Sequence, residues 1–427
     1  MTRLSGSLAE TIFALSSGAP PAAIAVVRIT GPKADAALEA LAGSLPEPRR
    51  AIMAALRAEG EVLDNALVMR FPGPNSATGE DVAELHLHGG RSVVSAVLAA
   101  LSGLPGLRAA LPGEFTRRAF ENDRIDLAEA EGLADLLEAE TEGQRRAALA
   151  LAGGALSRQV ADWQALLLAL AAEVEAALDF SDEDDVAPLP ADHDERLGML
   201  RAELAAWQRR PPAERLRDGV RVVIAGPPNA GKSTLLNVLA QRDAAIVSAA
   251  PGTTRDLIEA PVAIGGLPFL LIDTAGLRDS PDEIEAIGVG RARASLRAAD
   301  LLLWLGGSDE SPEGAIIVHP KADLGPPRGR ADICVSAKTG EGLDALVRIL
   351  IHRSSVLLPL EGEVALNARH RAALADALKS LELDADRDPL IRAEGLRRAM
   401  LALDRITGKA GVEDMLDALF GRFCIGK

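Results

Sequence analysis

The spacing of hydrophobic positions changes along the chain. Up to about residue 112, short apolar runs of strand type, such as 23–29 and 83–87, alternate with loops rich in glycine and proline. Alanine, leucine, glutamate and arginine then dominate to about residue 210, and apolar residues recur there at helical spacing, as at Leu127 and Ala130. The pattern predicts an α+β region that is followed by long helices.

Strands and helices are expected to alternate in the next region. Apolar runs at 222–225 and 269–272 have the length of buried strands, and 234–240 has a helical pattern. Helical spacing then resumes from 367 to 423, with a break at Arg387-Asp388-Pro389. We therefore predict a multidomain protein with three parts: an α+β N-terminal domain (1–115), a discontinuous all-α helical domain (116–215 and 357–427) and an inserted α/β domain (216–356).

A phosphate-loop pattern, G-x-x-x-x-G-K-[ST], lies between the first of these strands and the helix, as Gly226-Pro227-Pro228-Asn229-Ala230-Gly231-Lys232-Ser233. Glycines let backbone N–H groups wrap a β-phosphate, the lysine neutralises the β- and γ-phosphate oxygens, and the serine hydroxyl holds Mg²⁺. A chance glycine turn is the alternative, but strand, loop and helix occur in the required order. The inserted domain is therefore expected to be a P-loop NTPase.

Three further segments indicate a GTPase. Asp273-Thr274-Ala275-Gly276 follows a strand, which places a carboxylate near Mg²⁺ and a glycine N–H near the γ-phosphate. The segment 251–256 contains Thr253 and Thr254, and it is the expected switch I, with a threonine hydroxyl that reaches Mg²⁺. Ser336-Ala337-Lys338 has the form of a base-contact signature, whose backbone is expected to recognise the guanine oxygen.

The base-specificity element departs from the usual Asn-Lys-x-Asp. This chain has Pro320-Lys321-Ala322-Asp323. Asp323 can accept from the guanine N1 and N2 hydrogens and Lys321 can cover the base, but proline has no side-chain amide, so reduced nucleotide affinity or selectivity is expected. A second departure is the short span 305–315, where a GTPase normally has a full helix between two strands.

The composition is that of a large globular protein, with 427 residues of which 48% are hydrophobic and 25% charged. No uncharged apolar run reaches the roughly 18 residues of a membrane helix, and Glu10 interrupts the segment where a signal peptide has its apolar core. We expect a cytoplasmic protein without a membrane segment. Cys334 and Cys424 lie far apart and predict neither a disulfide framework nor a zinc site.

The net charge of −16 opposes nucleic-acid binding through a broad surface field, so any RNA contact is expected to be local. The candidates are four arginine pairs: Arg117-Arg118, Arg145-Arg146, Arg209-Arg210 and Arg397-Arg398. Such pairs on alanine-rich helices are more often solvated faces with acidic neighbours, and we favour that interpretation for each. The acidic run 181–185 predicts a solvated turn between helices, and an aromatic content of 3% without tyrosine argues against a base-stacking sheet.

Several short motifs carry a family resemblance over essentially the whole chain. They are Arg28-Ile29-Thr30-Gly31, Phe71-Pro72-Gly73-Pro74-Asn75-Ser76, Thr78-Gly79-Glu80-Asp81, His88-Gly89-Gly90, Pro112-Gly113-Glu114-Phe115-Thr116 and the terminal Phe423-Cys424-Ile425-Gly426-Lys427. Together with the inserted GTPase, they closely resemble the MnmE (TrmE) family of tRNA-modification GTPases.

This resemblance implies a GTP-hydrolysing enzyme that works with an FAD-dependent partner, MnmG (GidA), on tRNA. The pair would install a carboxymethylaminomethyl or aminomethyl group at C5 of the wobble uridine, with 5,10-methylene- or 5-formyl-tetrahydrofolate as one-carbon donor. The family's folate contacts fall on Arg28, Glu84, Arg124 and Lys427, and Arg124 stands where lysine is frequent. A homodimer held by its N-terminal domains, and a heterotetramer with the partner, are also implied.

The resemblance further implies that K⁺ aids hydrolysis, since no arginine finger in cis is evident. The family's ligands for K⁺ fall on Asn229, Ser248, the backbone of Ala250 and Thr253, and those for Mg²⁺ on Ser233 and Thr254. Glu285 matches the family's catalytic glutamate, and an exposed acidic residue is the alternative. Cys424 is expected to be either a nucleophile near the folate or a buried small side chain.

The expected nucleotide contacts are Asn229, Ala230, Gly231, Lys232, Ser233, Thr234, Ser248, Thr253, Thr254, Asp273, Thr274, Ala275, Gly276, Lys321, Asp323, Ser336, Ala337 and Lys338. Two other functions stay open at this point. A folate-binding scaffold with impaired nucleotide turnover would agree with Pro320 and the short 305–315 span. A ribosome-assembly GTPase with a helical appendage would require a basic RNA-binding module, which the acidic composition does not show.

Overall fold

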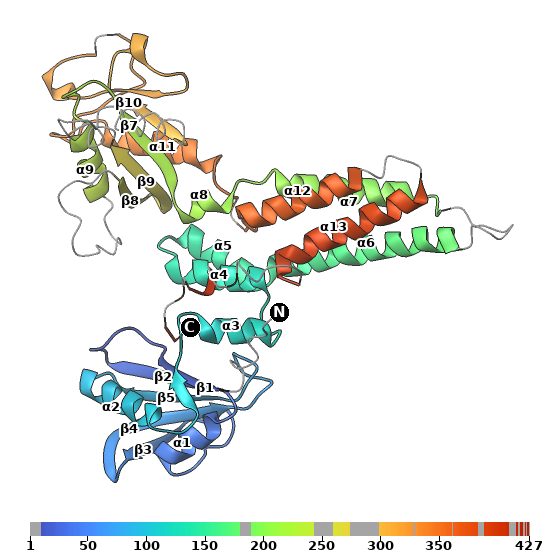
Figure 1. The fold of residues 1–427 in the computed structure, drawn as a ribbon. Coiled ribbons are helices and arrows are strands. Elements are labelled where there is room, and N and C mark those ends of the chain that lie inside the picture. Colours follow the sequence, from blue (N-terminus) through green and yellow to red (C-terminus); the bar gives the residue numbers. More distant parts are fainter. Residues whose placement is uncertain are drawn as a thin grey trace, which may run out of the picture. The chain divides into compact units, whose positions relative to one another are not determined.

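The computed structural model describes residues 10–179, 189–242, 259–273, 299–327, 329–360, 362–382, 388–409, 416, 419–421, 423 and 425–426. The chain forms two compact units, one of residues 1–134 with 407–427 and one of residues 135–406. Figure 1 shows the helices and strands that make up each unit. The sequence-based boundaries of the three domains stay predictions.

The first unit contains a six-stranded sheet with strand order β3-β4-β5-β2-β1-β6. Its strands are β1 Thr11–Leu15, β2 Ile24–Thr30, β3 Ile52–Ala58, β4 Glu61–Phe71, β5 Val82–His88 and β6 Leu107–Ala109. Only the β1–β6 pair is parallel among the pairs of these strands. Helices α1 (Ala34–Ala42) and α2 (Arg91–Ser102) pack on one face, where alternate strand residues form the core. The predicted α+β region is confirmed.

The opposite face of this sheet carries the other half of the alternating side chains. Helix α3 (Glu114–Glu121) covers β1 there, where Phe115 packs on Ile12 and Ala14. Farther along the same face, Ile24 of β2 and Met53 of β3 are 60% and 66% exposed. In the described part of the chain, Thr30 at the end of β2 and Val82 at the start of β5 are buried on this face, and the remainder forms an open face over β2, β5, β4 and β3.

A buried cluster of charges fixes α3 to the sheet. The Arg118 side chain is 1% exposed, and its Nη1 and Nη2 atoms lie 3.0 Å from Glu80 Oε2 and 3.2 Å from Glu114 Oε1. Arg108 adds a second cation at 2.6 Å from Glu114. Burial alone would raise the pKa of Glu114, but hydrogen bonds from Arg108 and the Leu111 N–H, with the nearby positive charges, outweigh it and lower that pKa.

The arginine-pair prediction is thus wrong for Arg118. The helical pattern indicated a solvated face, but α3 lies against β1 and the 73–81 loop, which a one-dimensional pattern does not show. The prediction is confirmed for two other pairs. Arg145 and Arg146 both lie 2.7 Å from Glu142, and Arg397 and Arg398 lie 2.8 and 2.6 Å from Glu394.

The C-terminal tail packs within the first unit. Phe420 and Phe423 form a small apolar cluster with Ala130, and the Phe420 ring lies 6.3 Å from that of Phe120. Beyond them, Ile425 forms a bridge with Pro112, and the Ser16 hydroxyl donates to the Gly426 carbonyl at 2.8 Å. Gly426 therefore lies beside the carboxyl end of β1.

Long helices make up much of the second unit, as the sequence predicted. Helix α4 (Leu127–Glu138) begins in the first unit, and the others are α5 Glu142–Ala152, α6 Ala155–Asp179, α7 His193–Gln208, α12 Ala368–Glu382 and α13 Pro389–Thr407. The rings of Trp163 and Trp207 join α6 to α7 edge to face, with centroids 5.2 Å apart. The predicted acidic turn at 181–185 lies outside the described residues. No described helix is long and apolar enough to span a membrane.

The second sheet, with strand order β12-β11-β10-β7-β9-β8, is parallel except for β8. Its elements are α8 Ala213–Arg217, β7 Val220–Ala225, α9 Lys232–Arg242, β8 Glu259–Ile264, β9 Leu267–Asp273, β10 Leu301–Trp304, β11 Ile316–His319, β12 Ile333–Cys334 and α11 Leu343–Ser355. Between β10 and β11 only a 3₁₀ turn forms, at Ser308–Glu310, so the expected loss of a helix in 305–315 is confirmed.

The chain enters and leaves this α/β region at one place. Pro212 forms a parallel bridge with Leu366, and the Ala213 N–H donates to the Leu366 carbonyl at 2.9 Å. Arg215 then ties α8 to the sheet through Asp300, at 2.7 Å. Because both ends of the segment lie side by side, the α/β fold is inserted in the helical region, as predicted.

Replacing Arg118 by Met is expected to destabilise the first unit by about 3–5 kcal/mol, because it leaves the carboxylates of Glu80 and Glu114 buried with one cation fewer. The same change at the neighbouring Arg117, whose pair with Glu121 is partly exposed, should cost less than about 1 kcal/mol. Hydrogen exchange of the β1 and β2 amides measures the local free energy of opening in each variant. Equal effects of the two substitutions would contradict a structural role for the cluster.

Candidate nucleotide-binding site

The predicted nucleotide-binding segments meet at one edge of the second sheet. The phosphate loop follows β7, Asp273 ends β9, the 320–323 segment follows β11, and Ser336 closely follows β12. Because these strands run parallel, all four segments leave the sheet at its carboxyl edge, which is where open α/β sheets bind ligands. The sheet topology therefore brings together the four segments that the sequence predicted separately.

The phosphate loop adopts backbone angles that require its glycines. Gly226 has φ 149° and Gly231 has φ 97°, and Asn229 between them has φ 62°. A Cβ atom at Gly226 would lie 3.0 Å from the backbone carbon of Leu305, the residue that follows the neighbouring strand β10. The loop therefore passes close to β10 and turns its backbone toward the start of α9, where helix N–H groups favour phosphate.

Lys232 lies folded over this loop. Its residue exposure is 7%, and its Nζ donates to the carbonyl oxygens of Gly226 and Pro227 at 3.2 and 3.0 Å. The ammonium group is thereby held at the centre of the loop, where the sequence predicted a contact with the β- and γ-phosphates. Ala230, Gly231 and Thr234 lie around it, in the loop and the first turn of α9.

Ser233 and Asp273 form an oxygen pair beside the loop. The Ser233 hydroxyl donates to Asp273 Oδ2, and Asp273 is 3% exposed at the end of β9. A hydroxyl and a carboxylate are ligands of the type that Mg²⁺ prefers, either directly or through water. The pair therefore fits the magnesium position that the sequence predicted from each residue separately.

The base-recognition segments are joined by a hydrogen bond that the sequence analysis missed. The Ser336 hydroxyl donates to Asp323 Oδ1 at 2.6 Å and accepts from the Thr339 N–H at 3.1 Å. One oxygen of Asp323 is thus fixed and the other can meet a base. The sequence indicated only a backbone role for Ser336, although a serine is the residue type that supports a carboxylate in this way. Ala337 and Lys338 follow in a turn.

Lys321 connects this segment to the phosphate loop. Its Nζ donates to the Asn229 carbonyl at 2.8 Å, and its own φ is 57°. Pro320 precedes it and has no side-chain hydrogen-bond donor. Among the described residues, the contact between the 320–323 segment and the phosphate loop is therefore the one made by Lys321. The departure at Pro320 lies directly in the predicted base site.

Several predicted site residues fall outside the described residues. They are Ser248, Ala250, Thr253, Thr254, Thr274, Ala275, Gly276, Glu285, Cys424 and Lys427. Their assignments stay predictions. Cys334, the other cysteine, is a half-buried free thiol.

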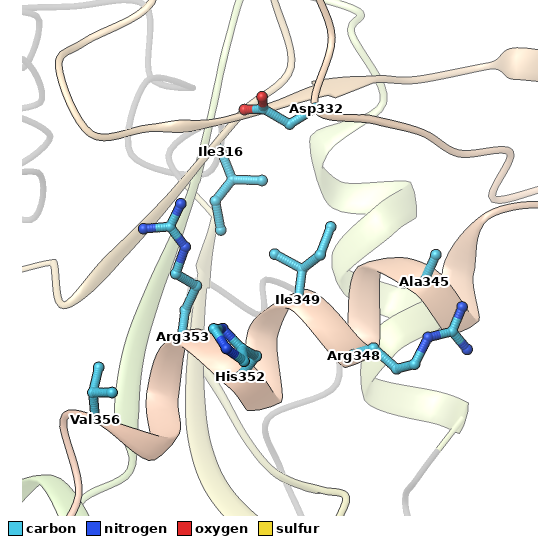
Figure 2. A pocket seen from close by; sticks show the side chains of 8 residues that line it. All are labelled: Ile316, Asp332, Ala345, Arg348, Ile349, His352, Arg353 and Val356. Atoms are coloured by element: carbon cyan, nitrogen blue, oxygen red, sulfur yellow. The ribbon is translucent and has the colours of Figure 1, made fainter.

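A pocket of about 710 Å³ lies elsewhere in the same unit (Figure 2). It is lined by Ile316, Asp332 and residues of α11, among them Arg348 and Arg353. Ile316 is the first residue of β11, so the pocket lies at the amino end of this strand. The phosphate loop and the base segment leave the opposite edge. The pocket is therefore no part of the nucleotide site.

A second predicted site lies on the open face of the first unit. Arg28 of β2 and Glu84 of β5 are directly opposite each other, and the Arg28 Nε and Nη2 atoms lie 3.0 and 2.9 Å from Glu84 Oε1. Both side chains are partly exposed, at 28% and 15%. Arg124 follows α3 and packs its stem near Gly79; in the described residues no hydrogen bond joins it to Glu84. The predicted Arg28–Glu84 pair is thus in contact.

The sheet order, the phosphate loop with its lysine, the Ser233–Asp273 pair and the Asp323–Ser336 pair define a P-loop GTPase. Models of two protein families match the chain, "GTP-binding protein TrmE N-terminus" over residues 11–124 and "MnmE helical domain" over residues 127–424. The chain belongs to the MnmE family of tRNA modification GTPases.

Two relatives called tRNA modification GTPase MnmE are similar over almost the whole chain. The protein of Rhizorhabdus wittichii is 60% identical, over 99% of this chain and 97% of its own length. That of Erythrobacter litoralis is 59% identical, over 98% of this chain and 100% of its own.

Replacing Pro320 by Asn is expected to tighten GTP binding roughly three- to tenfold, because the amide restores about one hydrogen bond. The affinity for ATP should not change, so the ratio of GTP affinity to ATP affinity should rise by the same factor. Calorimetric titration with each nucleotide measures this ratio. Pro326→Asn, an exposed proline of the following loop, is the matched control. A Pro320→Asn variant that binds GTP no better than the parent would contradict this role.

Proposed function

We propose that this chain hydrolyses GTP and, with an FAD-dependent partner of the MnmG (GidA) type, modifies C5 of the wobble uridine in tRNA. The product would carry a carboxymethylaminomethyl or aminomethyl group. The observation that carries the proposal is the nucleotide site of an MnmE-family chain, with Lys232 over the phosphate loop and Asp323 fixed by Ser336. Family membership supports tRNA as the substrate.

The proposed hydrolytic site uses Mg²⁺ and K⁺. Ser233 and Thr254 would hold Mg²⁺, and Asn229, Ser248, the Ala250 carbonyl and Thr253 would hold K⁺. The two proposed ligands that the structure describes have positions that suit these ions. Ser233 lies beside the Asp273 carboxylate, and Asn229 is exposed in the phosphate loop. Lys232 would leave its two carbonyl partners for phosphate oxygens, and Glu285 would orient the attacking water.

The proposed folate site uses Arg28, Glu84, Arg124 and Lys427. The Glu84 carboxylate is partly exposed and can accept from the amino and ring N–H groups of a pterin, while basic side chains can meet the glutamate tail. Tetrahydrofolate would supply the carbon, as the 5,10-methylene or 5-formyl form. The Gly426 carbonyl accepts a hydrogen bond from the Ser16 hydroxyl beside β1, which supports a role on this unit for Lys427 and Cys424, its close neighbours in the sequence.

The proposed assembly is a homodimer joined through the first unit, with two partner subunits in a heterotetramer. Its support in the structure is the open sheet face, where the large apolar side chains of Ile24 and Met53 are exposed. Binding of GTP, Mg²⁺ and K⁺ would bring two GTPase domains together, and hydrolysis would drive the conformational cycle of the tRNA reaction. A protein that acts on tRNA is expected to work in the cytoplasm.

Two other functions make different predictions. A folate-binding scaffold would bind folate but show no K⁺-stimulated hydrolysis. A ribosome-assembly GTPase would need an unneutralised basic surface, yet Arg145, Arg146, Arg397 and Arg398 are all paired with carboxylates. Membership in the MnmE family favours the tRNA-modification proposal over the second of these.

Replacing Glu285 by Ala is expected to lower the rate of GTP hydrolysis about 10²- to 10⁴-fold, since it removes a group that orients the attacking water. GTP binding should be retained, because the phosphate loop is unchanged. The modified nucleoside should also be lost when tRNA is incubated with the partner, FAD, a folate donor, GTP and an amine source, either ammonium or glycine, and then digested for mass spectrometry. Glu283→Ala, two residues away, is the control. Full nucleoside formation by Glu285→Ala would contradict the coupling of hydrolysis to modification.

A further inference from the structure

The two oxygens of the Glu84 carboxylate are held by different residues. Both guanidinium nitrogens that reach it, Arg28 Nε and Nη2, contact Oε1, at 3.0 and 2.9 Å. The other oxygen, Oε2, lies 3.3 Å from His86 Nε2. Arg28 therefore fixes one end of the carboxylate only, and the orientation of Oε2 depends on the histidine.

The surroundings of the His86 imidazole offer few other polar contacts in the described residues. It lies two residues after Glu84 on the same face of β5, and its cross-strand neighbours are Val26 of β2 and Leu67 of β4, both apolar. Its side chain is 27% exposed, and in the described residues Glu84 is the polar group that the ring contacts. A half-buried imidazole between two apolar residues is thus directed at one carboxylate oxygen.

Arg28, Glu84 and His86 form a row of side chains across β2 and β5, and Arg28, at the end opposite His86, also has a neighbour. The Phe115 ring of α3 lies with its centroid 6.0 Å from Arg28 Cζ, at the outer limit of a cation–π contact. Phe115, Arg28, Glu84 and His86 therefore follow one another across β2 and β5 on the open face. The carboxylate at the centre is restrained from both sides, before any ligand binds.

We infer that His86 is a positioning residue for the folate site, which orients Oε2 of Glu84 toward an N–H group of the pterin; this inference rests on the proposed function. A carboxylate has about four lone-pair positions; Arg28 occupies two on Oε1 and His86 one on Oε2, which leaves one position on Oε2 for a ligand. Because this position is on Oε2, the rotational setting of the carboxylate decides whether a ligand N–H can reach it in good geometry. The His86 Nε2–H holds the carboxylate in one rotational setting and so reduces the ordering that the ligand must impose.

Calorimetric titration of the full chain with 5-formyltetrahydrofolate tests this role. His86→Ala should weaken binding roughly three- to tenfold, the usual worth of one hydrogen bond. His86→Gln, whose amide N–H can reach the same oxygen, should restore affinity to within about twofold. His88→Ala is the matched control, because His88 lies on the same face of the same strand, is 74% exposed and contacts Asp64 instead.

A double-mutant cycle separates positioning from a general effect on the strand. If His86 acts through the Glu84 carboxylate, His86→Ala should cost almost nothing in a Glu84→Gln background. Equal losses in both backgrounds, or a loss with His86→Gln as large as with His86→Ala, would overturn the inference and leave the folate site standing. A parent chain that does not bind 5-formyltetrahydrofolate would overturn the proposed folate site and this inference with it.

Discussion

The nucleotide site depends on one constraint, the common edge at which the parallel strands of the second sheet end. Strands β7, β9, β11 and β12 each deliver one segment to that edge, although these segments are spread over more than a hundred residues. Two contacts then tie them together across the edge, from Ser233 to Asp273 and from Lys321 to the Asn229 carbonyl. Because the strands fix the positions, the loss of a helix between β10 and β11 does not remove any part of this site.

The first unit uses a different constraint, the alternation of side chains along antiparallel strands. One set faces α1 and α2 as core, and the other set presents Arg28, Glu84 and His86 on the open face. The buried Arg118 cluster and the C-terminal tail hold α3 and β1 around this face. The chain thus places candidate folate residues on sheet strands, and its nucleotide residues on loops, the start of α9 and the end of β9 at one edge of the other sheet.

The sequence predicted the fold class, the phosphate loop with its flanking strand and helix, and the shortened 305–315 span, because these follow from local period and spacing. It missed contacts that depend on tertiary placement. Arg118 was expected on a solvated face, yet it is buried, since only the fold brings α3 onto β1. The supports from Ser336 to Asp323 and from His86 to Glu84 were also missed, because no motif includes them and each is set by strand register or loop geometry.

The most direct test is the rate of GTP and of ATP hydrolysis by the purified chain in potassium and again in sodium, with Mg²⁺ in both. We expect turnover of GTP, little turnover of ATP, and dependence on potassium, which would agree with recognition of guanine by Asp323 and with a contribution of Asn229 to a cation site. Equal turnover of the two nucleotides would contradict guanine recognition, and no turnover in either salt would contradict the assignment of this chain as a GTPase.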